Sequence, residues 1–244
     1  MKKIISMLGV LLLMVALSAC SYHPRDSVKK PSSRPLPRKQ PSDDLVLREA
    51  PTEPRTLQKK IIVIDPGHGG DDYGTRSASK PKYHEKSLNL ATALLLSEYL
   101  QKMGYQTFMT RSTDEFISLQ KRAELANDRE ADLFISVHYN SAPAKEAEGV
   151  EIFYYKSDVD KSRSSESRQL ATAILGQIIK LTEAKSRGVK HGNFAVIRET
   201  KMPAVLIEGG FLTNEEEMEK IKNPAYVRSL AWGIASGVQN YLKL

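Results

Sequence analysis

Three side chains capable of chemistry stand at the carboxyl ends of apolar, β-branched runs. They are His68 after residues 61–64, His138 after 133–137 and Glu208 after 204–207. If these runs are parallel strands of one sheet, their carboxyl ends meet at one edge and the three side chains face one crevice. Two imidazoles and a carboxylate can bind a metal ion or move protons. This edge is therefore the predicted site.

Spacing alone leaves a structural interpretation open. A single histidine after a strand is more often a hydrogen-bonded loop residue than a metal ligand. Glu85 opens a predicted helix, where a carboxylate also complements the helix dipole. Since 17 residues separate His68 from Glu85 and 53 separate Glu85 from His138, no compact zinc signature such as H-E-x-x-H is present.

Strand-like and helix-like segments alternate along residues 61–244. Short β-branched runs predict strands, and apolar residues spaced three to four apart predict helices. The predicted strands are 61–64, 105–110, 133–137, 150–155, 194–197 and 204–207. The predicted helices are 86–103, 118–129 and 165–184, and residues 214–243 are expected to be largely helical. Because several strands are apolar on both faces, we expect an α/β fold. It is a single three-layer sandwich with a mainly parallel, mixed central sheet flanked by helices.

Residues 1–19 have the composition of a signal peptide. Two lysines precede an apolar run that is too short to span a bilayer comfortably, and the run ends in Leu17-Ser18-Ala19-Cys20. This tetrapeptide resembles the lipobox of bacterial lipoproteins, which implies that Cys20 is lipidated and anchors the protein to a membrane. The alternatives are an ordinary secretory signal or a short membrane anchor. The lipobox implies a cell-envelope protein facing the periplasm, and Ser21 favours the outer membrane where there are two.

Residues 20–60 are predicted to be a disordered, proline-rich, basic linker that carries the lipidated Cys20 at its start. They hold seven of the twelve prolines, and residues 21–60 contain ten basic against five acidic side chains. Residues 61–244 carry 24 of each sign, so the net charge of +7 lies outside the predicted catalytic domain. This balance excludes a basic face on the domain and therefore a nucleic-acid partner.

We expect the protein to be a monomer.

Six segments of the predicted domain occur in the order found in one enzyme family. They are IVIDPGHGGDDYGT (62–75), HEKSLNLA (84–91), TRSTDEFISLQKRAELAN (110–127), ADLFISVHYNSAP (131–143), GVEIFYY (149–155) and RGVKHGNFAVIRETKMPAVLIEGGFLTN (187–214). Together they resemble the zinc-dependent N-acetylmuramoyl-L-alanine amidases, a cell-wall amidase family that acts in cell division and in spore or phage lysis. The resemblance covers essentially all of residues 61–244.

The resemblance implies a ligand set and a catalytic base. It makes His68, Glu85 and His138 the ligands of one zinc ion per chain, and it makes Glu208 the catalytic carboxylate. His84 is a rival to Glu85, although the Glu-Lys pair at 85–86 matches the family motif. Gly209 departs from the family by replacing a residue that is often larger. The implied fold, a mixed sheet flanked by helices, agrees with the pattern of segments.

The implied activity is a peptidoglycan hydrolase that cleaves the amide between N-acetylmuramic acid and L-alanine with zinc-activated water. The resemblance also makes Arg187, Lys190 and Asn193 candidates for substrate binding. Some members carry a long occluding insertion after the GVEIFYY-type strand. Only about ten residues, 156–165, occupy that place here, so we expect an open site without built-in autoinhibition.

Supporting roles follow for the neighbouring polar residues. We expect Asp65 to hydrogen-bond a ligand imidazole, Asp71 and Asp72 to be turn residues, and Arg111 and Arg122 to form structural ion pairs. Two alternative functions compete with the amidase. One is a non-catalytic lipoprotein that binds peptidoglycan, and the other is a different zinc hydrolase of the wall, either a peptidase or a deacetylase.

Overall fold

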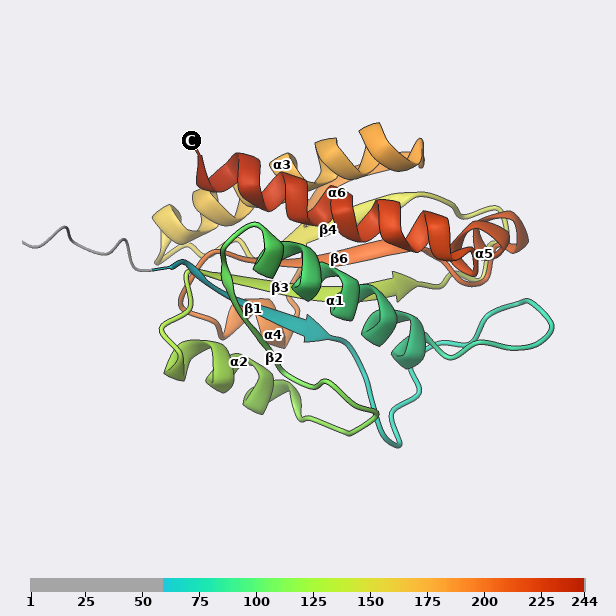
Figure 1. Ribbon diagram of the computed structural model, residues 1–244, viewed down its shortest axis with the longest axis horizontal. Helices are drawn as coiled ribbons and strands as arrows, with labels where there is room; N and C mark the ends of the chain where they lie inside the picture. The colour runs from blue at the N-terminus through green and yellow to red at the C-terminus, as the bar shows by residue number, and fades with distance from the viewer. Residues whose placement is uncertain (1–58, 244) are drawn as a thin grey trace, which may run out of the picture. The chain divides into compact units, whose positions relative to one another are not determined.

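The computed structural model describes residues 59–243, which form one six-stranded sheet with helices on both faces (Figure 1). The strand order is β2-β1-β3-β6-β4-β5. The strands are β1 (Ile61–Pro66), β2 (Gln106–Met109), β3 (Leu133–Asn140), β4 (Val150–Tyr154), β5 (Ser186–His191) and β6 (Ala204–Phe211). Strands β2, β1, β3 and β6 are parallel, and β4 and β5 run antiparallel to them. The predicted α/β sandwich with a mainly parallel, mixed sheet is confirmed.

The helices divide between the two faces of the sheet. They are α1 (Glu85–Lys102), α2 (Leu119–Asp128), α3 (Lys161–Thr182), α4 (Ala195–Arg198), α5 (Glu215–Ile221) and α6 (Pro224–Leu242). Ile62 and Ile64 of β1 belong to the core formed with α1, α3 and α6, whereas Val63 belongs to the core formed with α2 and α4. The alternation of side chains along each strand thus divides the apolar core into two layers. Figure 1 shows α2 and α4 on the side opposite α1 and α6.

One predicted element was wrong. Residues 194–197 were expected to form a strand, but Ala195–Arg198 form the short helix α4, which buries Val196 and Ile197 against the sheet. The strand in this region is β5, whose exposed and half-buried residues lack an apolar pattern because β5 lies at the edge of the sheet. Residues 214–243 are largely helical, as predicted. They form two helices, α5 and α6, because Asn223 caps a new helix that Pro224 opens.

Other boundaries shift by a few residues. Helix α3 begins at Lys161 rather than 165, because the Asp160 side chain accepts a hydrogen bond from the Arg163 backbone N–H and caps the helix. Within residues 59–243 no helix is long and apolar enough to cross a membrane. The predicted signal peptide, Cys20 and the linker up to residue 58 lie outside the described residues.

Because β1, β3 and β6 are parallel, their carboxyl ends lie together at one end of the sheet, across the strands. These three strands are adjacent in the sheet, and they are the ones followed by or containing His68, His138 and Glu208. Helix α1 starts at the same edge and contributes Glu85 as its first residue. The fold therefore gathers the four residues singled out from the sequence.

Candidate functional site

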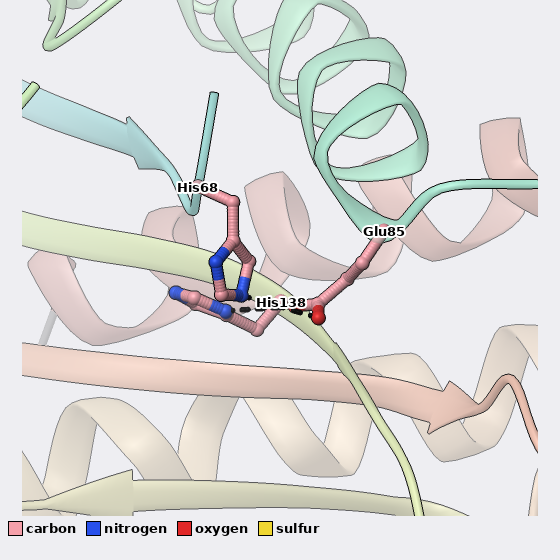
Figure 2. Close-up of side chains that lie close together, drawn as sticks. All are labelled: His68, Glu85 and His138. Atoms are coloured by element: carbon pink, nitrogen blue, oxygen red, sulfur yellow. Dashed lines mark hydrogen bonds and ion pairs between the residues drawn. The ribbon is translucent and has the colours of Figure 1, made fainter. Parts of the chain in front are cut away.

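His68, Glu85 and His138 form a compact cluster at the carboxyl edge of the sheet. Figure 2 shows their three side chains pointing toward one another from the turn after β1, the start of α1 and the end of β3. His68 Nε2 lies 3.1 Å from Glu85 Oε2, and His138 Nδ1 lies 2.9 Å from Glu85 Oε1. One ligand atom of each residue lies within 4.8 Å of the other two. A single ion can therefore contact all three.

The turn after β1 presents His68 from a left-handed backbone. Its φ is 60°, and the two glycines that follow also have positive φ. A non-glycine residue in this region is uncommon and recurs at functional sites, where the surrounding structure holds it in place. Here Arg111 donates a hydrogen bond to the Gly67 carbonyl at 2.7 Å, and Arg122 donates one to the His68 carbonyl at 2.8 Å.

Glu85 is the most buried member of the cluster, with a side chain 5% exposed. Its Oε2 accepts a hydrogen bond from the Thr75 backbone N–H at 2.9 Å, and its Oε1 accepts one from Asn89 Nδ2 at 3.2 Å. Burial by itself raises the pKa of Glu85, but the hydrogen bonds with His138 and His68 outweigh it and hold the pKa far below its usual value. The lowered pKa favours the ionised form of Glu85.

Asp72 hydrogen-bonds to Nδ1 of His68, the ring nitrogen that does not face Glu85. Its Oδ2 lies 2.8 Å from His68 Nδ1, and its Oδ1 accepts a hydrogen bond from the Gly74 backbone N–H. Burial lowers the pKa of His68, but the carboxylates of Glu85 and Asp72 outweigh it, so the pKa is raised. A carboxylate behind an imidazole fixes its tautomer and orientation. Asp72, predicted as a turn residue, is thus also the partner of His68.

Asp65 is not a partner of an imidazole, so that expectation was wrong. Its buried carboxylate accepts hydrogen bonds from Thr110 Oγ1, Arg122 Nη1 and Ser136 Oγ at 2.6, 2.7 and 2.8 Å. These three donors, from the segment after β2, from α2 and from β3, occupy both oxygens of the carboxylate. The ion pair predicted for Arg122 is confirmed. Arg111 instead donates to the backbone carbonyls of Pro66, Gly67, Lys86 and Thr113.

Two glycines, Gly67 and Gly74, leave room for the side chains of the cluster because neither glycine carries a Cβ. A Cβ on Gly67 would lie 2.0 Å from His138 Cε1. A Cβ on Gly74 would lie 2.6 Å from Glu85 Oε2 and from His68 Cδ2. Two imidazoles and a carboxylate form the donor set of hydrolytic zinc sites, which keep a fourth position for water. The residues present therefore fit a zinc ion.

Glu208 lies beside His138 in the sheet. The two are paired residues of the parallel β3–β6 ladder, so their side chains point to the same face. Glu208 Oε2 is buried and has no hydrogen-bond partner among residues 59–243. Burial raises the pKa of Glu208 well above its usual value, and the negative charges of Glu85 and Glu151 raise it further. A carboxylate in these surroundings can accept and release a proton.

Glu151 continues the same row of the sheet. It pairs with Glu208 in the antiparallel β4–β6 ladder, and its side chain is 6% exposed. Arg187 Nε lies 3.0 Å from Glu151 Oε2, Lys190 Nζ also donates to Oε2, and Asn140 Nδ2 lies 2.7 Å from Oε1. The structure therefore brings two of the predicted substrate-binding residues, Arg187 and Lys190, together on one carboxylate.

Two other candidates lie outside these clusters. Asn193 is exposed, and its Oδ1 accepts a hydrogen bond from Arg198 at 2.8 Å rather than contacting Glu151. His84, the rival ligand, precedes α1, and its ring centroid lies 4.8 Å from that of Tyr73. Its Nδ1 is buried without a partner among the described residues. The structure places Glu85, and not His84, in the cluster.

Sequence reasoning missed Asn89 and Glu151. Asn89 lies one helical turn after Glu85, and this i, i+4 spacing could have identified it as a partner. Glu151 is recognisable only through the register of β4 against β6, which no short motif contains. Asp72 lies four residues after His68 in an irregular turn, so spacing gave no signal for their contact.

An apolar pocket of about 410 Å³ adjoins the cluster, with His68 and His138 in its wall. The segment before α2 and the start of α4 form its sides, including Phe116 and Phe194. Strand β4 and helix α3 are joined by residues 155–160 alone, as short a connection as the sequence predicted. The pocket gives the side of the site next to His68 and His138 the concave, largely apolar form of a ligand pocket.

Comparison with known proteins places the chain in a family. A family model described as N-acetylmuramoyl-L-alanine amidase matches residues 62–240. The chain is 36% identical over 185 residues to the uncharacterized protein YqiI of Bacillus subtilis. That match covers 76% of this chain and 86% of YqiI. It is 34% identical over 189 residues to the probable cell wall amidase LytH of Staphylococcus aureus, covering 78% of this chain and 60% of LytH.

A solved structure agrees with both the sequence match and the geometry. The crystal structure of the N-acetylmuramoyl-L-alanine amidase from Clostridium difficile 630 has a TM-score of 0.71 and 41% identity to this chain. The match covers 76% of this chain and 97% of that structure. With a family match over most of its length and the same fold, the chain belongs to the N-acetylmuramoyl-L-alanine amidase family.

Proposed function

We propose that this chain is an active zinc-dependent amidase in which His68, Glu85 and His138 hold the metal and Glu208 is the catalytic base. Membership of the family gives the reaction, which is hydrolysis of the amide that joins N-acetylmuramic acid to L-alanine in peptidoglycan. The observation that carries the proposal is the buried Oε2 of Glu208, which lies next to His138 in the sheet and has no hydrogen-bond partner in the part of the chain that the structure describes. An unpaired buried carboxylate oxygen is costly unless a substrate, water or proton uses it.

The metal is assigned from the donor set. Zinc, when bound, supplies a Lewis acid that polarises the scissile carbonyl and lowers the pKa of water toward about 7. Glu85 adds one negative charge to two imidazoles, and Asp72 and Asn89 orient the ligands from behind. The Gly67 and Gly74 positions leave the space that these side chains occupy. We propose one zinc ion per chain.

Glu208 carries the proton in this scheme. Its carboxylate accepts a proton from the attacking water as the oxygen bonds to the lactyl carbonyl carbon. It then donates that proton to the nitrogen of L-alanine as the carbon–nitrogen bond breaks, so that the amine leaves uncharged. A raised pKa makes the Glu208 carboxylate a stronger base than an exposed one, which suits a group that must take a proton and return it.

The location and regulation of the enzyme complete the proposal. Cys20, if lipidated, anchors the chain in the envelope, and the proline-rich segment up to residue 60 lets the domain reach the wall. The short connection from β4 to α3 supports an enzyme that acts without an activator. We further propose that it acts as a monomer with peptidoglycan as its substrate.

Mass spectrometry of muropeptides treated with the purified full chain tests this function. The metal-loaded protein, a chelated sample and Glu208→Gln are compared. Free stem peptides that begin with L-alanine, produced only by the metal-loaded chain, are the expected result. Shortened peptides or lost acetyl groups would make the chain a peptidase or deacetylase instead. A protein that binds zinc and muropeptides yet releases no product would indicate a wall-binding protein.

A further inference from the structure

The apolar pocket beside the cluster of His68, Glu85 and His138 has exposed aromatic side chains in its wall. Phe116, in the loop before α2, is 61% exposed, and Phe194, just before α4, is 39% exposed. The Phe194 ring also packs edge-on against Phe153, with centroids 5.1 Å apart, which holds it in place. Large apolar side chains left in water around a cleft indicate a binding surface. Their position next to His68 and His138 makes the pocket part of the substrate cleft.

The charged groups of this pocket are already paired. Asp65 forms an ion pair with Arg122 at 2.7 Å and also accepts two hydroxyl hydrogen bonds. Asp72 is engaged by His68 and by the Gly74 backbone N–H. An anionic ligand group would find no unpaired cation there among the described residues. The pocket therefore favours an uncharged ligand with an apolar face.

The row of paired residues that begins at His138 and leads away from β1 has the contrary chemistry. The residues His138, Glu208 and Glu151 follow one another across β3, β6 and β4 on one face of the sheet. Beyond them lie Arg187 and Lys190, two cations that share the single carboxylate of Glu151 and leave an excess charge of +1. Their side chains are 32% and 41% exposed, so a ligand can reach them.

The two halves of the substrate differ in the same way. On one side of the scissile amide is a glycan, uncharged, with C–H faces on its pyranose rings and methyl groups on its acetamides. On the other side is a stem peptide that carries carboxylates. We propose that the sugar of the muramoyl group occupies the apolar pocket between Phe116 and Phe194, and that the peptide runs toward Lys190 and Arg187. This inference rests on the proposed amidase function and assigns the direction in which the substrate lies.

Three soluble substrates with the same stem peptide separate the two halves. They are the disaccharide peptide, the muramoyl peptide, and a D-lactoyl peptide that keeps the scissile amide and lacks the sugar. Phe116→Ala should raise KM and lower kcat/KM roughly tenfold or more on both sugar-bearing substrates, because the variant loses the burial of one aromatic side chain. On the lactoyl peptide it should match the wild type. Lys190→Met should lose activity on all three substrates.

Three controls separate a loss of sugar binding from a general loss of folding or activity. Leu94→Ala removes a side chain that is 45% exposed on α1, on the other face of the sheet, and should change none of the three rates. Phe194 packs on Phe153, so Phe194→Leu is used beside Phe194→Ala in case the larger truncation disturbs folding. Binding of the disaccharide peptide by calorimetry in the Glu208→Gln background gives a readout without turnover, and Phe116→Ala should weaken it.

The outcomes separate this inference from the proposed function. An equal loss on the lactoyl peptide in Phe116→Ala would show that the pocket binds peptide, and the inference would be wrong. Unchanged rates and unchanged binding on every substrate would also overturn it. If the wild type cleaves none of the three, the amidase function fails, and the binding measurement still decides whether the pocket holds the sugar.

Discussion

Glu151 and Glu208 are paired residues of the antiparallel β4–β6 ladder, so two carboxylates lie side by side on one face of the sheet. Arg187, Lys190 and Asn140 surround Glu151, whereas Glu208 Oε2 has no partner among residues 59–243. Burial raises the pKa of Glu151, but its two cationic partners outweigh this and lower it. Burial and neighbouring charge raise the pKa of Glu208. The surroundings of these two neighbouring carboxylates thus shift their pKa values in opposite directions.

The first prediction concerns the pH dependence of stability at Glu151. Because its pKa is lower in the folded state than in the unfolded chain, its contribution to stability is present above the unfolded value of about 4.5. That contribution is lost as the pH falls through the lowered folded pKa. Glu151→Gln should therefore lower the urea midpoint at pH 7 and flatten its decline below pH 4.5.

The matched control is Glu148→Gln. Glu148 also pairs with a lysine, Lys185 at 2.9 Å, but both side chains are well exposed. Exposed pairs contribute little, so its urea midpoint at pH 7 should stay close to that of the wild type. Equal effects of the two substitutions would contradict the structural role given to Glu151.

A second prediction concerns the buried ion pair of Asp65 and Arg122. Both side chains are at most 2% exposed, and Arg122 also donates to the carbonyls of Pro66 and His68. Arg122→Met leaves a buried, uncompensated carboxylate, which should lower the free energy of unfolding by about 3–5 kcal/mol. Urea denaturation measures this loss. Arg129→Met, an exposed arginine that packs over Phe108, should cost less than about 1 kcal/mol.

Some parts of this site follow from the sequence and others do not. The meeting of His68, His138 and Glu208 follows from apolar strands that end in polar residues, because parallel neighbours share an edge. Glu85 lies far from both histidines in the sequence, so only the family resemblance singled it out. Asp65 was expected to hydrogen-bond a ligand imidazole, but Asp72 does so, because the choice depends on the path of a turn with several positive φ angles.

The misassigned segment 194–197 has a similar explanation. A four-residue apolar run fits a buried strand as well as a turn of helix, and local pattern cannot separate them. The edge position of β5 decides the matter, because the chain leaves the sheet after His191 and the apolar side chains of α4 cover the face beside α2. Glu151 was missed for a related reason, since its pairing with Glu208 depends on the antiparallel entry of β4.

A third prediction uses Asn89, which stands behind Glu85. Its Nδ2 donates to Glu85 Oε1 at 3.2 Å and to the Gly67 carbonyl at 3.1 Å, so it connects the ligand to the turn after β1. Asn89→Ala should weaken zinc binding about 10- to 100-fold, as measured by competition with a chromogenic chelator. Gln101→Ala, an exposed substitution on the same helix, should leave zinc affinity unchanged. Unaltered affinity in Asn89→Ala would remove Asn89 from the metal site.

The last prediction tests the space that the glycine at 67 provides. The φ of Gly67 is not positive, so alanine is allowed there by the backbone, and the effect of the substitution is steric. The added Cβ would lie 2.0 Å from the His138 ring, and the imidazole must move away from Glu85. Gly67→Ala should therefore abolish both amidase activity and tight zinc binding while the far-ultraviolet circular dichroism of the sheet and helices is retained.

Gly176→Ala is the control, because no atom of residues 59–243 outside the helix's own backbone lies within 4 Å of a Cβ at that position in α3. This exchange should stabilise the helix by about 0.5–1 kcal/mol and leave zinc affinity unchanged. The two alanine variants add the same methyl group, so any difference in metal binding comes from its position beside His138. If Gly67→Ala bound zinc as tightly as Gly176→Ala, zinc binding would not depend on the position of the His138 ring. The assignment of His138 as a ligand would then have to be withdrawn.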